Sequence, residues 1–243
     1  MVETVVVTAS AGSFPGLVEA LRGLPAEVEE RPLMTFAPPV DWSPVDRAIA
    51  ELGRFDALAV TSPRAARAFA ERLAGPRTAP PVWAAGAGTA TALGTALGPV
   101  RTPPADVVGT VGAAAALSRA MLEAGVRGPV LFPCGEVRRE ELPARLRAEG
   151  IEVVEVVCYR SVLAGAAAAR TAAERARVLV VASPSVADLL ARACPPGARP
   201  ALLAVGPTTA AAARAAGWIP AGVARRPAVD ALVAGVRALL ATH

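Results

Sequence analysis

The chain repeats itself once, at a distance of about half its length. FDALAVTSPRAARAFAERL (55–73) aligns with ARVLVVASPSVADLLARAC (176–194), and WAAGAGTATALGTALG (83–98) aligns with LAVGPTTAAAARAAG (203–217). A third pair, 4–33 and 129–158, precedes these two. If 4–33 is named block A, 55–73 block B and 83–98 block C, the order A-B-C occurs once in the first half and again as 129–158, 176–194 and 203–217. The period is far longer than the roughly 20–50 residues of solenoid repeats. The repeat therefore indicates a duplication and two similar lobes.

Within each block, short apolar runs alternate with Ala-, Leu- and Arg-rich segments of helical length. The predicted strands are 4–8, 57–60, 82–84, 129–132, 151–157, 177–181 and 201–205. The predicted helices are 14–22, 63–74, 88–97, 137–148, 184–193, 208–216 and 229–241. Strands that are apolar throughout and separated by helices are typical of parallel sheets covered on both faces. The predicted fold class is α/β, with doubly wound parallel sheets.

Helix boundaries are marked by serine, proline and glycine. Ser62-Pro63 and Ser183-Pro184 place a capping serine before a proline in the first helical turn. Four glycines stand where a left-handed residue would end a helix: Gly75, Gly98, Gly150 and Gly217.

Two segments that follow the A blocks have the composition of linkers. Residues 31–44 are Pro-rich and extended, and 157–165 are their counterpart. These segments could run side by side, in which case each A block would join the B and C blocks of the other half. The residue pattern by itself leaves swapped and unswapped lobes open.

Composition excludes several classes of protein. Hydrophobic residues make up 53% of the 243, which excludes a disordered chain. The 25 basic residues are all Arg, the net charge is only +4, and no run of like charges forms a nucleic-acid-binding arm. With five Phe, three Trp and one Tyr, the chain has too few aromatic side chains to stack bases. We expect no nucleic-acid partner.

Histidine and cysteine limit the available chemistry. The one histidine is His243, which argues against a Ser-His-Asp triad, a histidine metal site and a histidine general base. Cys134, Cys158 and Cys194 show no CxxC pairing and indicate reduced thiols in a reducing compartment. We expect no metal.

One uncharged stretch, 78–100, is long enough to span a bilayer. It contains three prolines and four glycines, so its pattern is that of strand, turn and helix. The sequence MVETVVVTAS has an acid and no basic residue, which is unlike a signal peptide. We expect a cytoplasmic protein with no membrane partner.

Five segments, in order, resemble the uroporphyrinogen-III synthase family. They are TSPRAARAF (61–69), AAGAGTATAL (84–93), RREELPARLRAEGIEVVEVVCYRS (138–161), SPS (183–185) and VGPTTAAAARAAGW (205–218). The resemblance covers essentially the whole chain. It implies two flavodoxin-like lobes joined by a two-stranded linker with crossed connectivity. One lobe would comprise 1–33 and 163–243, the other 38–156, and the linkers would be 34–37 and 157–162.

The resemblance also implies a reaction. Members of the family cyclise hydroxymethylbilane, a linear tetrapyrrole with eight carboxylates, to uroporphyrinogen III. Water is lost and the terminal (D) ring is inverted, on the route to haem, sirohaem, cobalamin and chlorophyll. Catalysis of this kind is largely orientation and requires no metal, nucleotide or covalent nucleophile. The expected protein is a cofactor-free monomer that takes its substrate by handover from hydroxymethylbilane synthase.

The resemblance assigns candidate site residues. Tyr159, the single tyrosine, falls on the family's motif tyrosine and is predicted to assist departure of the substrate hydroxyl, although a linker tyrosine can also simply pack. The predicted substrate-binding residues are Ser62, Arg64, Gly86, Thr89, Gly135, Arg138, Ser183, Gly206, Thr208 and Thr209. The turns that contain them present backbone N–H groups to carboxylates, and the arginines add charge-assisted bonds. The same serines, threonines and glycines could instead be helix caps and turn residues, and Arg138 with its neighbour Arg139 could be part of a solvated face.

Two positions depart from the family pattern. Ala9 stands where the family usually has Arg, and Ala182 where it favours Thr.

Two other functions compete with the synthase. A two-lobed protein that binds an anionic small molecule without catalysis is the alternative function. A dinucleotide enzyme is excluded, because no first strand leads into GxGxxG.

Overall fold

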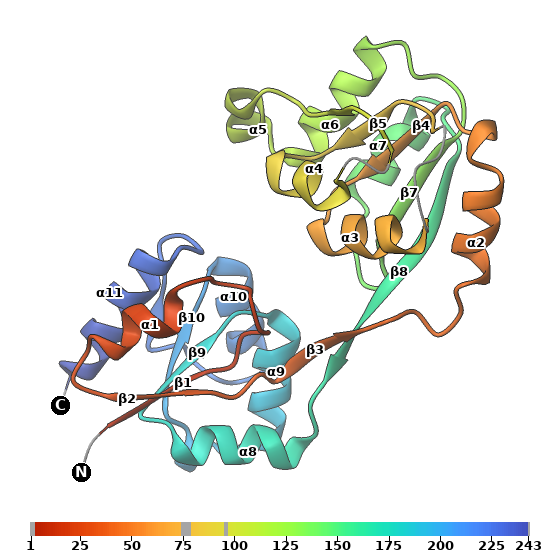
Figure 1. Cartoon of the computed structure of the whole chain (residues 1–243). Helices are drawn as coiled ribbons and strands as arrows, with labels where there is room; N and C mark the ends of the chain where they lie inside the picture. Colours follow the sequence, from red (N-terminus) through yellow and green to blue (C-terminus); the bar gives the residue numbers. More distant parts are fainter. Residues whose placement is uncertain (1–2, 74–78, 95–96, 243) are drawn as a thin grey trace. The chain divides into compact units, whose positions relative to one another are not determined.

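Two α/β units, each with its own parallel sheet, make up the chain (Figure 1). The computed structural model describes residues 3–73, 79–94 and 97–242. Unit 1 combines Met1–Thr35 with Val162–His243, and unit 2 is the continuous segment Phe36–Ser161. Unit 1 is therefore built from both ends of the sequence. In Figure 1 the red strand β1 (Thr4–Val7) lies in the same sheet as β9 (Val178–Val181) and β10 (Ala201–Ala204).

Unit 1 has five parallel strands in the order β2-β1-β9-β10-β11. Its strands are β1 (Thr4–Val7), β2 (Glu27–Glu30), β9 (Val178–Val181), β10 (Ala201–Ala204) and β11 (Gly222–Val223). Its helices are α1 (Leu17–Arg22), α8 (Ala166–Arg175), α9 (Pro184–Ala193), α10 (Pro207–Ala215) and α11 (Val229–Leu240). Numbered within the unit, the strand order is 2-1-3-4-5, which is that of flavodoxin-like folds.

Unit 2 has the same order in permuted form. Its sheet runs β3-β8-β7-β4-β5-β6. The strands are β3 (Met34–Ala37), β4 (Ala57–Val60), β5 (Val82–Ala84), β6 (Val100–Arg101), β7 (Val130–Gly135) and β8 (Val153–Leu163). The helices are α2 (Ser43–Ala50), α3 (Pro63–Arg72), α4 (Ala87–Leu93), α5 (Ala105–Val111), α6 (Ala113–Glu123) and α7 (Glu141–Ala148). If β7 and β8 are counted first, the order of the five strands from β8 to β6 is again 2-1-3-4-5.

The pairing settles how the duplicated blocks combine. Strand β1 of the first A block pairs with β9 of the second B block, with Val6 opposite Leu179. Strand β7 of the second A block pairs with β4 of the first B block, with Ala57 opposite Val130. The connectivity is therefore crossed, and β3 and β8, neighbours in one sheet, carry the chain from one unit to the other. The predicted fold class is confirmed.

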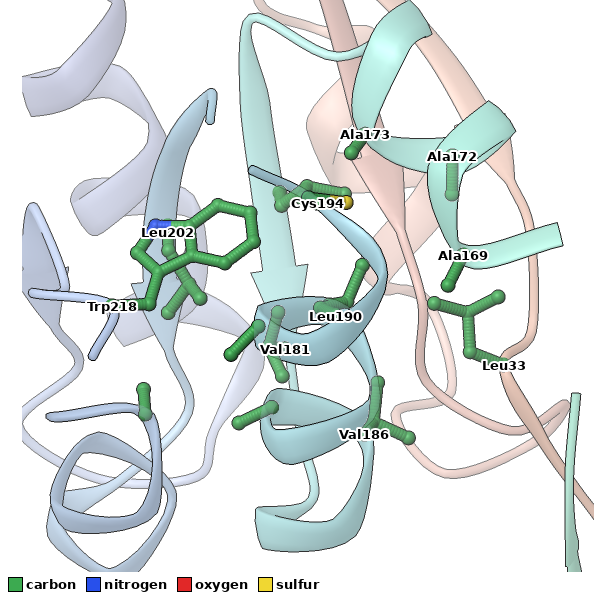
Figure 2. Close-up of a cluster of buried hydrophobic side chains, with 14 of the residues drawn as sticks. Leu33, Ala169, Ala172, Ala173, Val181, Val186, Leu190, Cys194, Leu202 and Trp218 are labelled. Carbon is green, nitrogen blue, oxygen red and sulfur yellow. The ribbon is translucent and has the colours of Figure 1, made fainter. Parts of the chain in front are cut away.

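The sheet of unit 1 is buried on both faces at its centre, because strands β1, β9 and β10 are apolar at almost every position. Val6 and Leu179 point into a core formed with α8, α9 and α10, whereas Val5 and Val180 point into a core formed with α1 and α11. Figure 2 shows the first of these cores, which includes Leu202 of β10 and Trp218. In unit 2 the two faces are covered by α2, α3 and α4 and by α6 and α7.

The three largest errors in the predicted helix ends show which residues control those ends. Helix α1 begins at Leu17 and not at residue 14, because Gly16 has φ +80°. Helix α7 begins at Glu141 and not at residue 137, which places Pro143 in the first turn, where its missing N–H costs nothing. Helix α4 ends at Leu93, followed by Gly94 at φ +63°.

Ser62 and Ser183 differ although both precede a helix that begins with proline. The Ser62 hydroxyl accepts a hydrogen bond from the Ala65 N–H, as predicted for a cap. Ser183 occupies the same position before α9 but makes no side-chain capping bond. The predicted left-handed glycines after helices are confirmed at Gly150, after α7, and at Gly217, after α10. Gly98 is also left-handed, but α4 already ends at Leu93, so the helix end predicted at Gly98 was wrong. Gly75 lies outside the described residues.

The uncharged stretch 78–100 forms β5, a turn and α4 in its described part, as its pattern predicted. None of the helices in the described ranges combines the length and the apolar composition that crossing a bilayer would require.

Candidate active site

The sheet of unit 2 changes direction of winding between β4 and β7. From β4 the chain moves outward to β5 and β6, and it returns to add β7 and β8 on the other side. In doubly wound sheets, ligands bind outside the carboxyl ends of the strands at such a point. A hollow of about 380 Å³ lies there, lined by Thr61 and Ser62 after β4, by Gly135 at the end of β7, and by 112–114 at the start of α6.

Tyr159 also lines this hollow, and its position depends on Gly135. The β7–β8 register shifts between Cys134 and Gly135, so that Gly135 lies opposite Tyr159. A Cβ atom on residue 135 would stand 2.6 Å from Cζ and 2.8 Å from the hydroxyl of Tyr159. Only glycine leaves room for the phenol to lie across the end of β7.

The Tyr159 hydroxyl faces Ser62. The two oxygens are 3.4 Å apart, longer than a usual hydrogen bond between hydroxyls. Ser62 Oγ also accepts the Ala65 N–H at 3.4 Å. The phenol therefore has one weak protein partner and retains the capacity to donate to a ligand.

On its other side, the Tyr159 ring contacts Phe36 of β3 and approaches Arg64 of α3. The two rings meet edge to face, with centroids 5.7 Å apart and planes at 77°. The Arg64 guanidinium lies 3.5 Å from the centre of the Phe36 ring and 5.9 Å from that of Tyr159. Burial lowers the pKa of Arg64, and the positive charge of Arg67 lowers it further.

A second hollow, of about 430 Å³, begins on this side of the tyrosine. Phe36, Trp42 and Tyr159 provide its aromatic walls, and Arg64 and Arg67 project from α3. Tyr159 thus lines both hollows, with the hydroxyl close to the switch point and the ring against Phe36.

Arg138 lines the hollow at the switch point, but acidic side chains already bind its charge. It pairs with Glu155, and with Glu140 at 3.3 Å, while Arg147 binds the other Glu155 oxygen at 2.5 Å. Burial would raise the pKa of Glu155, but the bonds from Arg138 and Arg147 outweigh it and the pKa is lowered. Arg139 lines the same hollow and is exposed.

Gly86 precedes α4 after strand β5, and Thr89 lies in the first turn of that helix. Neither residue is among those that line the two hollows. Thr89 is buried. Gly86 has φ 178°, an extended conformation open to any residue, and an added Cβ would meet no atom within 4 Å. Neither backbone conformation nor packing therefore explains this glycine.

The remaining predicted residues belong to unit 1. Ser183 follows β9, and Gly206, Thr208 and Thr209 follow β10, so all four lie at the carboxyl ends of adjacent strands. Thr209 is buried and Thr208 is exposed. Gly206, like Gly86, is extended and has open space where a Cβ would be.

Cys134 and Cys158 flank the site as buried thiols. Burial raises the pKa of each to about 12. Within residues 3–73, 79–94 and 97–242, no three His, Cys, Asp or Glu side chains gather closely enough to hold a metal ion.

A family model described as uroporphyrinogen-III synthase HemD matches residues 16–234 of the chain. The chain belongs to the uroporphyrinogen-III synthase family. A uroporphyrinogen-III synthase of Synechococcus elongatus is 31% identical over 172 residues. That match covers 65% of this chain and 61% of the relative, so the chain spans about three fifths of the length of this curated relative.

Solved structures of uroporphyrinogen-III synthases share the fold. A mutant enzyme from Thermus thermophilus is 19% identical with a TM-score of 0.62, and the match covers 99% of this chain and 100% of that one. The Helicobacter pylori enzyme is 20% identical with a TM-score of 0.60, and the match covers 96% and 97% of the two chains.

Sequence reasoning missed several residues that line the two hollows. Phe36 and Arg67 were not among the predicted site residues, although both line the hollow beside Tyr159. Helix α6, whose start borders the hollow at the switch point, was not predicted either. A signal for α6 was available, since AAAALSRAMLE has strong helix formers at most positions.

Proposed function

We propose that this member of the uroporphyrinogen-III synthase family has the activity of its namesake, the cyclisation of hydroxymethylbilane to uroporphyrinogen III. The substrate is a linear tetrapyrrole with eight carboxylates. The reaction removes one water molecule and inverts the terminal ring, and it requires no cofactor.

The observation that carries the proposal is the position of Tyr159. Its hydroxyl lies at the carboxyl ends of β4 and β7, in a hollow at the switch point, where a ligand of a doubly wound sheet is expected. The one tyrosine of the chain is held there by Gly135 beneath it and Phe36 beside it.

Tyr159 would act on the departing hydroxyl. The phenol O–H donates to the hydroxymethyl oxygen, the C–O bond breaks as the pyrrole nitrogen releases electron density, and water leaves. The substituted carbon of the terminal ring attacks the resulting azafulvene cation and gives a spiro intermediate. The bond between that carbon and its original methylene bridge then breaks, and the free carbon of the same ring attacks this methylene, so that the ring is inverted as the macrocycle closes. The proton that this ring finally loses restores the phenol, so that the net change is loss of one water.

Orientation supplies the remaining part of catalysis. The linear tetrapyrrole closes spontaneously to the wrong isomer, so the protein must hold it in a conformation that presents one particular ring carbon. Backbone N–H groups of the turns at Ser62, Gly86 and Gly135 would bind substrate carboxylates in unit 2. Ser183, Gly206, Thr208 and Thr209 provide turns of the same kind in unit 1.

Isomer analysis tests the function directly. Hydroxymethylbilane is generated in place, the purified protein is added without metal or cofactor, and the oxidised porphyrins are separated by chromatography. We expect isomer III to dominate. Isomer I alone, at the uncatalysed rate, would reject the synthase activity and favour a non-catalytic protein that binds an anionic small molecule.

The cellular setting belongs to the same proposal. The protein acts as a monomer in the cytoplasm and receives its substrate from hydroxymethylbilane synthase. The three free thiols, Cys134, Cys158 and Cys194, support a reducing compartment. Light scattering during size-exclusion chromatography, with and without that enzyme, measures both the oligomeric state and the handover complex.

A further inference from the structure

The hollow between β3, α2 and α3 has an unmatched positive charge. It is lined by Phe36, Trp42 and Tyr159 and by three arginines of one helix, Arg64, Arg67 and Arg72. One acid, Glu71, lies among them. The three arginines differ in whether a carboxylate of the protein already accepts hydrogen bonds from their guanidinium groups.

Arg72 is satisfied. Its Nε and one terminal nitrogen each lie 2.7 Å from a carboxylate oxygen of Asp46, a bidentate pair, and its guanidinium lies 5.2 Å from the centre of the Trp42 ring. The hydrogen bonds that Arg72 donates to Asp46 raise the pKa of Arg72. Arg72 therefore closes the end of the hollow near α2 and has little capacity for a ligand.

Arg64 is not satisfied. It is half-buried, and no carboxylate in the described part of the chain lies within 4.0 Å of its guanidinium. The ring of Phe36 lies 3.5 Å from the guanidinium and covers one face of it. The ring accepts no hydrogen bond from the five N–H groups, which point outward in the plane of the guanidinium. Removal from water without an acceptor is costly, and the lowered pKa of Arg64 has burial as its main cause. A planar, supported guanidinium with free in-plane donors matches a carboxylate.

Arg67 lies one turn further along α3 and lines the same hollow. It too has no ion pair within the described ranges. Two arginines three residues apart on one helix face the same space. Together they would outweigh the single charge of Glu71.

We infer that this hollow is a binding subsite for one pyrrole ring of the substrate, with Arg64 and Arg67 binding a carboxylate of that ring. The inference rests on the proposed function. Phe36 is a positioning residue, since it supports Arg64 and contacts Tyr159 at once. A ring bound here lies against Tyr159, so the subsite fixes the distance between a bound carboxylate and the phenol hydroxyl.

A direct binding measurement on the full chain does not depend on catalysis. Benzene-1,2,4,5-tetracarboxylate is titrated into the wild type by calorimetry at low salt. Loss of charge-assisted hydrogen bonds should weaken binding about tenfold or more in Arg64→Gln and further in Arg64→Gln/Arg67→Gln. Arg119→Gln, which removes the same charge from a surface helix of unit 2, is the matched control and should bind like the wild type. Absence of wild-type binding, or equal losses in all three variants, would overturn the inference.

Kinetics separate this subsite from the function itself. If the wild type makes isomer III, the double arginine variant should raise KM about tenfold or more with a smaller change in kcat, because Arg64 and Arg67 touch no reacting atom. An unchanged KM would reject the subsite while leaving the synthase activity intact. If the wild type makes only isomer I, the function fails, and the calorimetric comparison still decides whether the arginines form a carboxylate site.

Phe36→Leu tests the positioning role without a change of charge. We expect weaker tetracarboxylate binding and a lower kcat, because both Arg64 and Tyr159 lose the ring that they contact. Incorporated 3-fluorotyrosine gives a single ¹⁹F resonance, as the chain has one tyrosine. That resonance should shift in Phe36→Leu and on addition of the tetracarboxylate. A resonance that moves in neither case would show that Phe36 is only a packing residue.

Discussion

At the residue scale, Tyr159 is positioned by neighbours from distant parts of the sequence. Gly135 leaves room for it, Phe36 contacts its edge, and Ser62 lies 3.4 Å from its hydroxyl. None of these neighbours is adjacent to Tyr159 in sequence. Together these neighbours hold the phenol hydroxyl in one position in the hollow, which favours a chemical role for Tyr159 over simple packing.

Tyr159→Phe should reduce kcat by about 10²–10⁴, the usual contribution of general acid catalysis, with little change in KM. The substitution keeps the ring and its contact with Phe36. Steady-state rates of isomer III formation measure the effect, and thermal unfolding should be nearly unchanged. A wild-type kcat would assign Tyr159 to the wall of the site.

Gly135→Ala should displace the phenol, because the new methyl group would stand 2.6 Å from Cζ of Tyr159. We expect a loss of stability of about 1–3 kcal/mol, typical of overpacking, and a fall in kcat. Chemical unfolding and isomer assays measure the two effects. Gly165→Ala is the control, since a Cβ there meets no atom within 4 Å and φ is −75°. Equal behaviour of the two variants would contradict the role of Gly135.

Cys134 and Cys158 should resist alkylation in the native state. Burial raises the pKa of both thiols to about 12, so the reactive thiolate is scarce at pH 8. Mass spectrometry after iodoacetamide treatment should show labelling of these residues only after unfolding in urea. Rapid labelling of the native protein at pH 8 would contradict the burial.

At the element scale, the central strands could be predicted from sequence and the edge strands could not. Strands β4 and β5 have the predicted ends, because buried parallel strands are continuous apolar runs. Strand β2, with the sequence EVEE, has only partly buried side chains and lacks that signal. The candidate site shows the same contrast. Ser62 and Tyr159 stood out in motifs, but the Gly135–Tyr159 contact depends on a register shift that local pattern does not encode.

An ion pair joins β2 to α8 in unit 1. Glu29 accepts hydrogen bonds from Arg175 and, at 2.6 Å, from Arg31. The bonds from Arg175 and then Arg31 lower the pKa of Glu29 from 4.5 to about 2.

Because this pKa is lower in the folded state, Glu29 should stabilise the protein above about pH 4.5 and lose that effect as the pH falls toward 2. Glu29→Gln should therefore be less stable than the wild type at pH 7, and the difference should shrink at pH 3. Urea unfolding at both pH values measures it, and added salt should reduce it. A difference that is independent of pH would show that the effect is not electrostatic.

At the scale of the whole molecule, the crossed connectivity makes the two units unequal. Unit 2 is one continuous segment, Phe36–Ser161, with cores on both faces of its sheet. Unit 1 needs residues from both ends of the chain, because β1 lies between β2 and β9.

A fragment of residues 36–161 should therefore fold by itself, whereas 162–243 should not, since the latter lacks the central strand β1. Circular dichroism and cooperative thermal unfolding of the two fragments check this expectation. Addition of a peptide of residues 1–35 should restore cooperative unfolding to 162–243. A fragment 36–161 without cooperative unfolding would mean that unit 2 depends on the rest of the chain.

The central place of β1 also sets an order of events on the ribosome. Thr8, which follows β1, donates to the Val180 carbonyl, 172 residues later in the sequence. Because the ribosome adds about 5–20 residues per second, roughly ten to thirty seconds pass between the synthesis of β1 and that of its partner β9. Unit 2 can be complete before that moment, so the nascent chain exposes an apolar strand beside an already folded neighbour. Early synthesis of β1 thus creates a need for protection from aggregation that an unswapped arrangement of the same blocks would largely avoid.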